Sequence, residues 1–303
     1  MIAVRKSHRV GNESEGSVEI STPEKQLKMT QQAQLPIGVF DSGVGGLTVL
    51  RALRSQLPDE DFIYLGDTAR LPYGTKSASS VERYSIQAAQ FLVARGIKCL
   101  VVACNTASAV ALDALRSAFA PLPVIGVVDP GASAACAASG SGHIGVLATE
   151  GTVQGGAYQR AIARLRPSAV VYAQPCSLFV ALAEEGWSEG PIAEAIARRY
   201  LEGILADERI DTLLLGCTHF PVLTSTLARV VGNSVGIVDS ARTTAAVLAQ
   251  QLQQNRLLRN EGRSAALRLM ATDGPERFAR VGSRFLGESF AVDQVELVDL
   301  GKP

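Results

Sequence analysis

The 303-residue chain lacks the features that mark several common classes of protein. Lys and Arg together number 29, as do Asp and Glu, so no charge excess indicates a nucleic-acid binder or a polyacidic chain. Aromatic residues make up only 5%, which does not favour a carbohydrate-stacking surface. No apolar run reaches the ~18 residues that a membrane span requires. Hydrophobic residues nevertheless make up 47%, enough for a substantial core, and the length predicts two domains.

The sequence also shows neither a pattern of paired cysteines nor a secretory signal. The five cysteines are an odd number with no C-x-x-C pair, which argues against a disulfide framework and a structural zinc site. The first 34 residues are polar, and no apolar segment follows their early basic residues as it would in a secretory signal. We therefore expect residues 1–34 to be a disordered or loosely docked extension of a protein in the reducing cytoplasm.

Short apolar runs alternate with helical patterns from Leu35 onward. The runs are rich in Val, Ile and Leu on both alternating faces, which is typical of strands buried on both sides of a parallel sheet; they are 37–40, 62–65, 99–103, 124–128, 144–148, 169–173, 212–215 and 235–238. Apolar residues at steps of three and four predict helices over 77–95, 107–119 and 191–206. A polar segment at 250–264 precedes one more strand, 265–270, and one more helix, 276–286. The alternation predicts an α/β fold.

Polar residues come directly after several of these apolar runs, and two runs are followed by the same kinds of residue. Ligands bind outside the carboxyl ends of the strands in open parallel sheets, so such residues are candidates for a site. Two runs end in a cysteine followed by two polar residues, Cys104-Asn105-Thr106 and Cys217-Thr218-His219. The repeated pattern predicts two similar halves, each with a mostly parallel sheet flanked by helices and each offering one thiol.

The cysteines can be interpreted in two ways. A free cysteine is most often a small buried hydrophobe, and Cys99, Cys136 and Cys176 fit that description. Cys104 and Cys217 instead stand at strand-to-helix turns, where the amides of a helix N-terminus favour a thiolate. Their positions alone leave both interpretations open.

The turn Asp41-Ser42-Gly43-Val44-Gly45-Gly46 has three interpretations. It resembles a dinucleotide-binding turn, with Asp67 as the ribose-binding acid, but Thr48 stands where the fingerprint requires glycine. Asp41 or Ser42 could instead cap the following helix. An amide-lined turn also holds a small carboxylate, which is the interpretation we favour.

Three further groups stand near these turns. His219 lies two residues after Cys217, and its pKa suits proton exchange near neutral pH. Glu184 and Glu185 end a helical stretch and would ordinarily be solvated. Tyr73 in the turn Pro72-Tyr73-Gly74 offers a hydroxyl.

The motifs together resemble those of the glutamate racemases of bacterial peptidoglycan synthesis, which belong to the aspartate/glutamate racemase family. The resemblance runs from about Gly38 to Leu286 and includes Val238-Asp239-Ser240 and Thr272-Asp273-Gly274. Its most specific segments are Val39-Phe40-Asp41-Ser42-Gly43-Val44-Gly45-Gly46-Leu47, Leu71-Pro72-Tyr73-Gly74, Val101-Val102-Ala103-Cys104-Asn105-Thr106-Ala107-Ser108 and Leu215-Gly216-Cys217-Thr218-His219-Phe220-Pro221.

The resemblance implies a cofactor-independent enzyme, without metal, that interconverts L- and D-glutamate. Cys104 and Cys217 would be its two acid/base residues, acting on the D- and the L-enantiomer respectively. Asp41 would assist Cys104; Glu184, with Glu185 as the alternative, and His219 would assist Cys217. The residues that would hold the substrate are Asp41, Ser42, Tyr73, Gly74, Asn105, Thr106, Thr218 and His219.

The domains expected from the resemblance are residues 35–128 plus 239–303 for the first and 129–238 for the second, with the active site in the cleft between them. A cell-wall precursor as activator and a homodimer are options that the resemblance leaves open. Racemisation of aspartate or a hydantoin on the same fold is the nearer alternative activity. A nucleotide-binding oxidoreductase is the remote one, because it leaves both cysteine turns unexplained.

Overall fold

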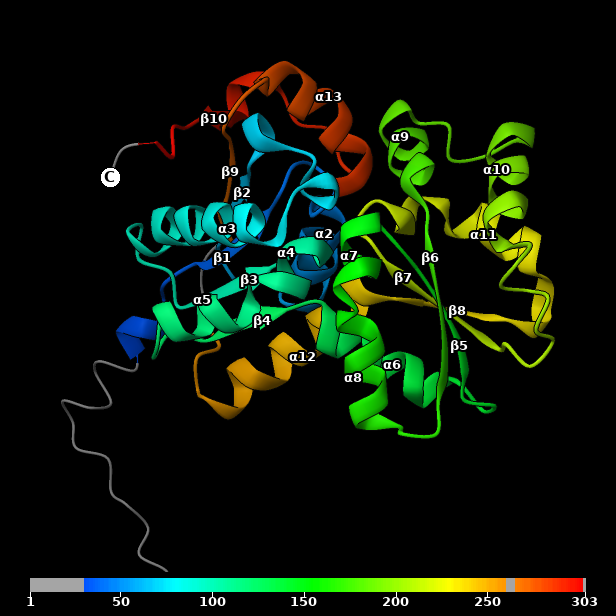
Figure 1. The fold of residues 1–303 in the computed structure, drawn as a ribbon. Helices are drawn as coiled ribbons and strands as arrows, with labels where there is room; N and C mark the ends of the chain where they lie inside the picture. Colours follow the sequence, from blue (N-terminus) through cyan, green and yellow to red (C-terminus); the bar gives the residue numbers. More distant parts are fainter. Residues whose placement is uncertain (1–29, 260–264, 302–303) are drawn as a thin grey trace, which may run out of the picture.

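Two parallel sheets lie side by side in the computed structural model, which describes residues 30–259 and 265–301 (Figure 1). The first sheet has the strand order β10-β9-β2-β1-β3-β4 and the second β6-β5-β7-β8. Every recorded pairing is parallel. The strands are β1 (Ile37–Asp41), β2 (Phe62–Gly66), β3 (Cys99–Val102), β4 (Val124–Gly126), β5 (His143–Ala148), β6 (Val170–Pro175), β7 (Thr212–Gly216), β8 (Gly236–Asp239), β9 (Leu267–Ala271) and β10 (Val295–Leu297).

Helices cover both faces of each sheet, which confirms the predicted α/β fold with two flanked parallel sheets (Figure 1). The α-helices are α2 (Leu47–Gln56), α3 (Ala78–Val93), α4 (Asn105–Val110), α5 (Leu112–Ala118), α6 (Val128–Ala138), α7 (Glu150–Gly155), α8 (Ala157–Leu165), α9 (Ser177–Glu185), α10 (Pro191–Leu201), α11 (Thr224–Val231), α12 (Ser240–Gln254) and α13 (Pro275–Leu286). Short 3₁₀ turns lie at Thr68–Arg70, Tyr73–Thr75, Phe220–Leu223, Gly232–Ser234 and Val292–Gln294.

The central strands follow from their apolar pattern. In β1, Ile37 and Val39 belong to the core beneath α2 and α13, whereas Phe40 belongs to the core on the opposite face. Alternate side chains of a strand point to opposite faces, so a strand covered on both sides must be apolar throughout. The prediction that these strands are buried on both sides is wrong for β6 and β8, whose residues are half-buried or exposed. Both are edge strands with a neighbour on one side only.

Some boundaries differ from the sequence-based expectation. The helix expected over 107–119 is two helices, α4 and α5, separated at Ala111. Helix α12 continues into the polar segment at 250–264, because Leu248 and Leu252 are spaced one turn apart and both are buried. Strand β10 was not expected, since three residues at a sheet edge carry almost no hydrophobic pattern.

The expected extension falls mostly outside the described residues. Residues 1–29 lie outside them, whereas residues 30–33 are helical. Ala33 is buried and its carbonyl accepts a hydrogen bond from Lys98 Nζ at 2.8 Å. The segment 1–34 is therefore anchored at Ala33, next to the start of β3.

The chain passes between the sheets twice. It leaves the first sheet after β4 and returns to it at β9, and helices α6 and α12 of these two crossings pack against each other. The expected domain limits at residues 128 and 238 lie near these crossings and stay a prediction. No helix within residues 30–259 and 265–301 has the length and hydropathy needed to cross a membrane.

Candidate active site

A cavity of about 150 Å³ opens where the carboxyl ends of strands from both sheets meet. Both cysteines contribute to its wall: Cys104 comes shortly after β3, and Cys217 follows β7 directly. The volume is below the ~300 Å³ at which pockets for drug-sized ligands begin, so it suits one small molecule. The wall consists of Ser42, Pro72, Tyr73, Gly74, Thr75, Cys104, Asn105, Thr106, Thr149, Glu150, Ser177, Val180, Cys217, Thr218 and His219.

Cys104 is a buried thiol at the start of α4. Its Sγ donates to Ser42 Oγ and accepts from the amide of Ala107, both at 3.5 Å. Burial raises the pKa of the thiol to about 12; the negative charge of Asp41 acts in the same direction, and the two hydrogen bonds partly offset both. Cys104 and Cys217 both lie on the wall of this one cavity.

Asp41 lies behind Cys104 and outside the cavity wall. It is fully buried at the end of β1, and its Oδ2 accepts a hydrogen bond from the amide of Gly43 at 2.9 Å. Burial raises the pKa of Asp41, while the charge of His219 and nearby backbone amides oppose the shift. Its Oδ1 has no hydrogen-bond partner among the described residues. Direct contact of Asp41 with a ligand, expected from the sequence, therefore does not follow from this geometry.

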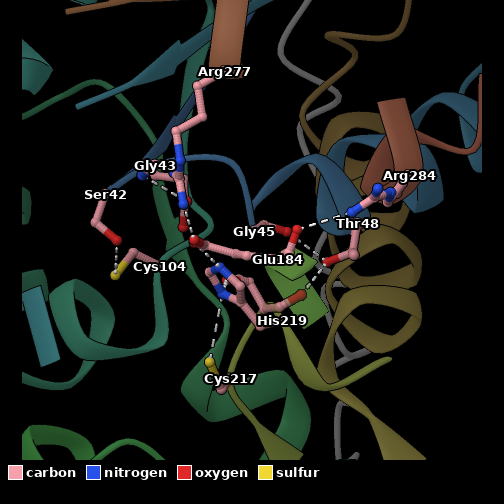
Figure 2. A network of polar contacts seen from close by, with 12 residues as sticks. Ser42, Gly43, Gly45, Thr48, Cys104, Glu184, Cys217, His219, Arg277 and Arg284 are labelled. Atoms are coloured by element: carbon pink, nitrogen blue, oxygen red, sulfur yellow. Dashed lines mark hydrogen bonds and ion pairs between the residues drawn. The ribbon is translucent and has the colours of Figure 1, made fainter. Parts of the chain in front are cut away.

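On the second side, Cys217, His219 and Glu184 form a chain of polar contacts (Figure 2). Cys217 Sγ lies 3.9 Å from His219 Nδ1, and His219 Nε2 lies 3.0 Å from Glu184 Oε1. Burial alone would lower the pKa of His219, but the hydrogen bonds and charges of Cys217 and Glu184 outweigh it and raise the pKa to about 10. The imidazole is therefore protonated at neutral pH.

Glu184, rather than Glu185, is the carboxylate in this chain. Burial would raise the pKa of Glu184, but its bonds to His219 and Arg277 lower it to about 2. Glu185 is exposed at the end of α9. Helical geometry explains the difference, because adjacent residues on a helix point about 100° apart.

Close packing explains the glycine-rich turn after β1. A Cβ at Gly45 would come closer than 3.0 Å to His219 Nδ1 and Thr218 Oγ1, and one at Gly46 would clash with Asp41. Thr218 and His219 thus pack directly against the main chain of the turn at Gly45. Gly46 is the N-cap of α2 and no side chain caps that helix.

The remaining predicted binding residues lie on the wall but differ in what they offer. The Tyr73 hydroxyl donates to Asp67 Oδ2 at 2.5 Å, so towards a ligand its oxygen remains an acceptor, and its role in binding stays a prediction. Asn105 Nδ2 donates to the Tyr158 hydroxyl at 2.7 Å, and its Oδ1 has no partner among the described residues. Thr106 Oγ1 lies 3.0 Å from Thr149 Oγ1, across the boundary between the two halves.

Several residues of the site were not singled out from the sequence. Thr149, Ser177 and Val180 belong to the wall, and Arg277 contacts Glu184 from α13. Only Thr149, which follows β5, carried a signal as a polar residue at a strand end. Of the other cysteines, Cys99 and Cys176 are buried as expected and Cys136 is half-buried. Within the part of the chain that the structure describes, no three His, Cys, Asp or Glu side chains converge as a metal site.

The fold and the cavity define a class: an α/β protein with two flanked parallel sheets and a small site whose wall carries one buried cysteine from each half. The chain belongs to the Asp/Glu/Hydantoin racemase family, whose model matches residues 37–248. The family resemblance predicted from the motifs is thereby confirmed.

Known relatives cover most of the chain. A glutamate racemase of Geobacter metallireducens is 51% identical over 251 residues, which are 83% of this chain and 92% of the relative. The crystal structure of the Francisella tularensis glutamate racemase in complex with D-glutamate matches with a TM-score of 0.82 and 38% identity, covering 89% of this chain and 99% of that one. The Escherichia coli glutamate racemase in complex with L-glutamate and the activator UDP-MurNAc-ala matches with a TM-score of 0.69 and 33% identity, covering 83% and 95%.

Proposed function

We propose that this chain interconverts L- and D-glutamate by a two-base mechanism in which Cys104 and Cys217 act from opposite sides of the substrate. The observation that carries the proposal is that one cavity of about 150 Å³ has a cysteine from each half of the molecule on its wall. The relatives named glutamate racemases, and the F. tularensis structure with D-glutamate, support glutamate as the substrate.

Racemisation requires that a proton leave one face of the α-carbon and that another arrive on the opposite face. Two fixed groups, one thiolate and one thiol, achieve this without turning the substrate, and they exchange protonation states with each turnover. A free thiol has a pKa near 8.5, closer to neutral pH than most side chains, and burial raises that of Cys104, so its thiolate is a stronger base than a free one. In the proposal Cys104 removes the proton of D-glutamate and Cys217 that of L-glutamate.

The surroundings of each sulfur support a division of roles. The protonated imidazole of His219, held by Glu184, lies beside Cys217 and places a positive charge next to its sulfur. On the other side, burial and the charge of Asp41 make the thiolate of Cys104 a strong base. Asp41 therefore acts on Cys104 through its charge, without direct contact to the substrate.

Substrate binding falls to the polar groups of the wall. The unpartnered Oδ1 of Asn105 accepts a hydrogen bond from the substrate ammonium group. The groups that offer donors to the two carboxylates and to the negative charge of the intermediate are Ser42, Gly74, Thr106, Thr149, Thr218 and His219. Preorganised donors of this kind stabilise developing charge without reorganisation at the moment of reaction.

The proposal extends to the cellular role. D-glutamate made by this chain would enter peptidoglycan synthesis in the cytoplasm. Because the E. coli relative was crystallised with the activator UDP-MurNAc-ala, a cell-wall precursor is also the expected effector here. Racemisation assays with and without that compound test this part, and light scattering of the purified protein tests for a homodimer.

The central experiment measures turnover and isotope uptake together. In deuterium oxide the wild type should convert L-glutamate to D-glutamate that carries deuterium at the α-carbon. Cys104→Ser and Cys217→Ser should each lose about 10³-fold or more in racemisation, because removal of an essential acid or base typically has that effect. Cys136→Ser is the matched control and should keep its activity. Full racemisation by either site variant, or turnover of L-aspartate or a hydantoin but not glutamate, would contradict the proposal.

A further inference from the structure

Two arginines of α13 hold the end of α9 that carries Glu184 (Figure 2). Arg277 Nη2 donates to Glu184 Oε2 at 2.6 Å, and Arg284 Nη1 donates to the main-chain carbonyl of Glu184 at 2.9 Å. The arginines are seven residues apart, which places them on one face of the helix, two turns from each other. Helix α13 follows β9 of the first sheet, whereas α9 follows β6 of the second.

The local structure of α9 is suited to this contact. Gly186 ends the helix in the left-handed conformation, with φ at +78°. A Cβ at this position would lie 2.8 Å from Arg284 Nη1, so a larger residue would force the guanidinium away. The last carbonyls of a helix lack intrahelical partners and carry partial negative charge, which a cation stabilises. Arg284 thus fixes the main chain of Glu184, and Arg277 fixes its side chain.

The carboxylate of Glu184 is shared between the two halves of the molecule. Its Oε1 contacts His219 and its Oε2 contacts Arg277, so rotation of the carboxylate would break both bonds. Phe285 of α13 also packs edge-to-face on the His219 ring, with the ring centroids 5.1 Å apart. Neither arginine belongs to the cavity wall.

We propose that Arg277 and Arg284 are positioning residues that set Glu184, and through it His219, in the geometry that serves Cys217. The inference rests on the proposed function of Cys217 and adds a requirement to it. Glu184 and His219 both belong to the second half, yet their orientation depends on a helix of the first half. Contact between the two halves through α13 and α9 is therefore required to hold His219 beside Cys217.

A double-mutant cycle tests this coupling. Arg277→Met should lower kcat by about 10- to 100-fold, the loss expected when a catalytic group is misplaced by about 1 Å, with KM for glutamate within about twofold. Glu184→Gln should also lower kcat. The double variant should be no slower than Glu184→Gln alone, because residues that act as one unit are not additive. Arg277→Lys should restore part of the rate.

Arg280 provides the matched control. It is exposed on the same helix and forms no hydrogen bond or ion pair within the described residues. Arg280→Met should keep kcat within about twofold. In the double variant with Glu184→Gln, the two losses in kcat should multiply, as they do for independent residues. If Arg277→Met does not fold, as judged by circular dichroism, Arg284→Met takes its place in the same cycle.

A spectroscopic measurement separates this inference from the proposed function. The chain has three histidines, so the imidazole ¹⁵N signals of His219 can be assigned by substitution. Arg277→Met should shift them and Arg280→Met should not. Unchanged His219 signals, an unchanged kcat in Arg277→Met, or losses that multiply in the double variant would each overturn the inference. If the wild-type protein does not racemise glutamate, the proposed function is overturned. The imidazole signals would still test whether Arg277 positions Glu184 and His219.

Discussion

Gly45 and His219 lie so close that the turn after β1 accepts no side chain at residue 45. A Cβ there would come closer than 3.0 Å to Nδ1 and Cε1 of the imidazole. Gly45 belongs to the first half and His219 to the second, so the two halves interlock at this point. The glycine is needed for this close approach and for no unusual backbone angle, since its φ is not positive.

Gly45→Ala should therefore displace His219 and reduce racemisation about 100-fold, the loss expected from a 1 Å shift of a catalytic group. Gly43→Ala in the same turn is the control, since its Cβ would meet Leu71 at an ordinary 3.6 Å. Steady-state kinetics of both variants provide the measurement. Equal activity of the two would show that His219 is free to move aside.

Tyr73→Phe should weaken the fold more than it weakens substrate binding. The hydroxyl donates to buried Asp67, and removing it should lower the free energy of unfolding by about 1–2 kcal/mol. KM for glutamate should stay within about threefold. Urea unfolding and kinetics test both parts, with Tyr84→Phe as the control, because the Tyr84 hydroxyl has no hydrogen bond within the described residues. A tenfold rise in KM at unchanged stability would instead assign the hydroxyl to the substrate.

The raised pKa of His219 predicts how stability varies with pH. Its value is about 10 in the folded protein against about 6.5 in the unfolded chain. Its contribution is thus complete below pH ~6.5 and is lost as the pH rises towards 10, with a slope of at most about 1.4 kcal/mol per unit. Unfolding measured between pH 7 and 10 should show a steeper decline for the wild type than for His219→Asn. Parallel declines would mean that the imidazole is not protonated in the folded protein.

Asp41→Asn should make Cys104 easier to alkylate at a given pH. Burial is the main cause of the raised pKa of this thiol and the charge of Asp41 is the next, so removing the charge lowers the pKa and increases the thiolate fraction. Peptide mapping after iodoacetamide treatment measures the rate, and Cys99 serves as the internal reference because its raised pKa does not depend on Asp41. A rate that does not increase would show that Asp41 is uncharged beside the thiol.

The central strands were predictable from sequence because they are covered on both faces. A strand such as β1 must be apolar at nearly every position, and few other elements of this length require such a pattern. Strand β10 was missed because Val295 is its only buried residue, so its place depends on pairing with β9 rather than on its own pattern. The continuation of α12 was missed because its glutamines obscured the buried Leu248 and Leu252.

The site was predictable from the sequence pattern where a reactive side chain directly follows a strand. Cys104 and Cys217 each come within two residues of a strand end, and parallel topology brings such ends to one edge. The geometry around them was not predictable, because Glu184 reaches His219 through the packing of α9. Arg277 reaches Glu184, 93 residues away in sequence, through the contact between the two halves. The hydrogen bond from the Tyr73 hydroxyl to Asp67 was not predictable either, because nothing in the local sequence indicates it.

The strand order of the first sheet also affects how the protein folds during its synthesis on the ribosome. Strand β2 pairs with β1 on one side and with β9 on the other, yet β9 is synthesised some 200 residues later, after the whole second sheet. At about 5–20 residues per second, the nascent chain exposes that edge for roughly 10 to 40 seconds. An unpaired, apolar inner strand is a template for aggregation. During translation the vulnerable surface is therefore β2, which the finished protein buries completely.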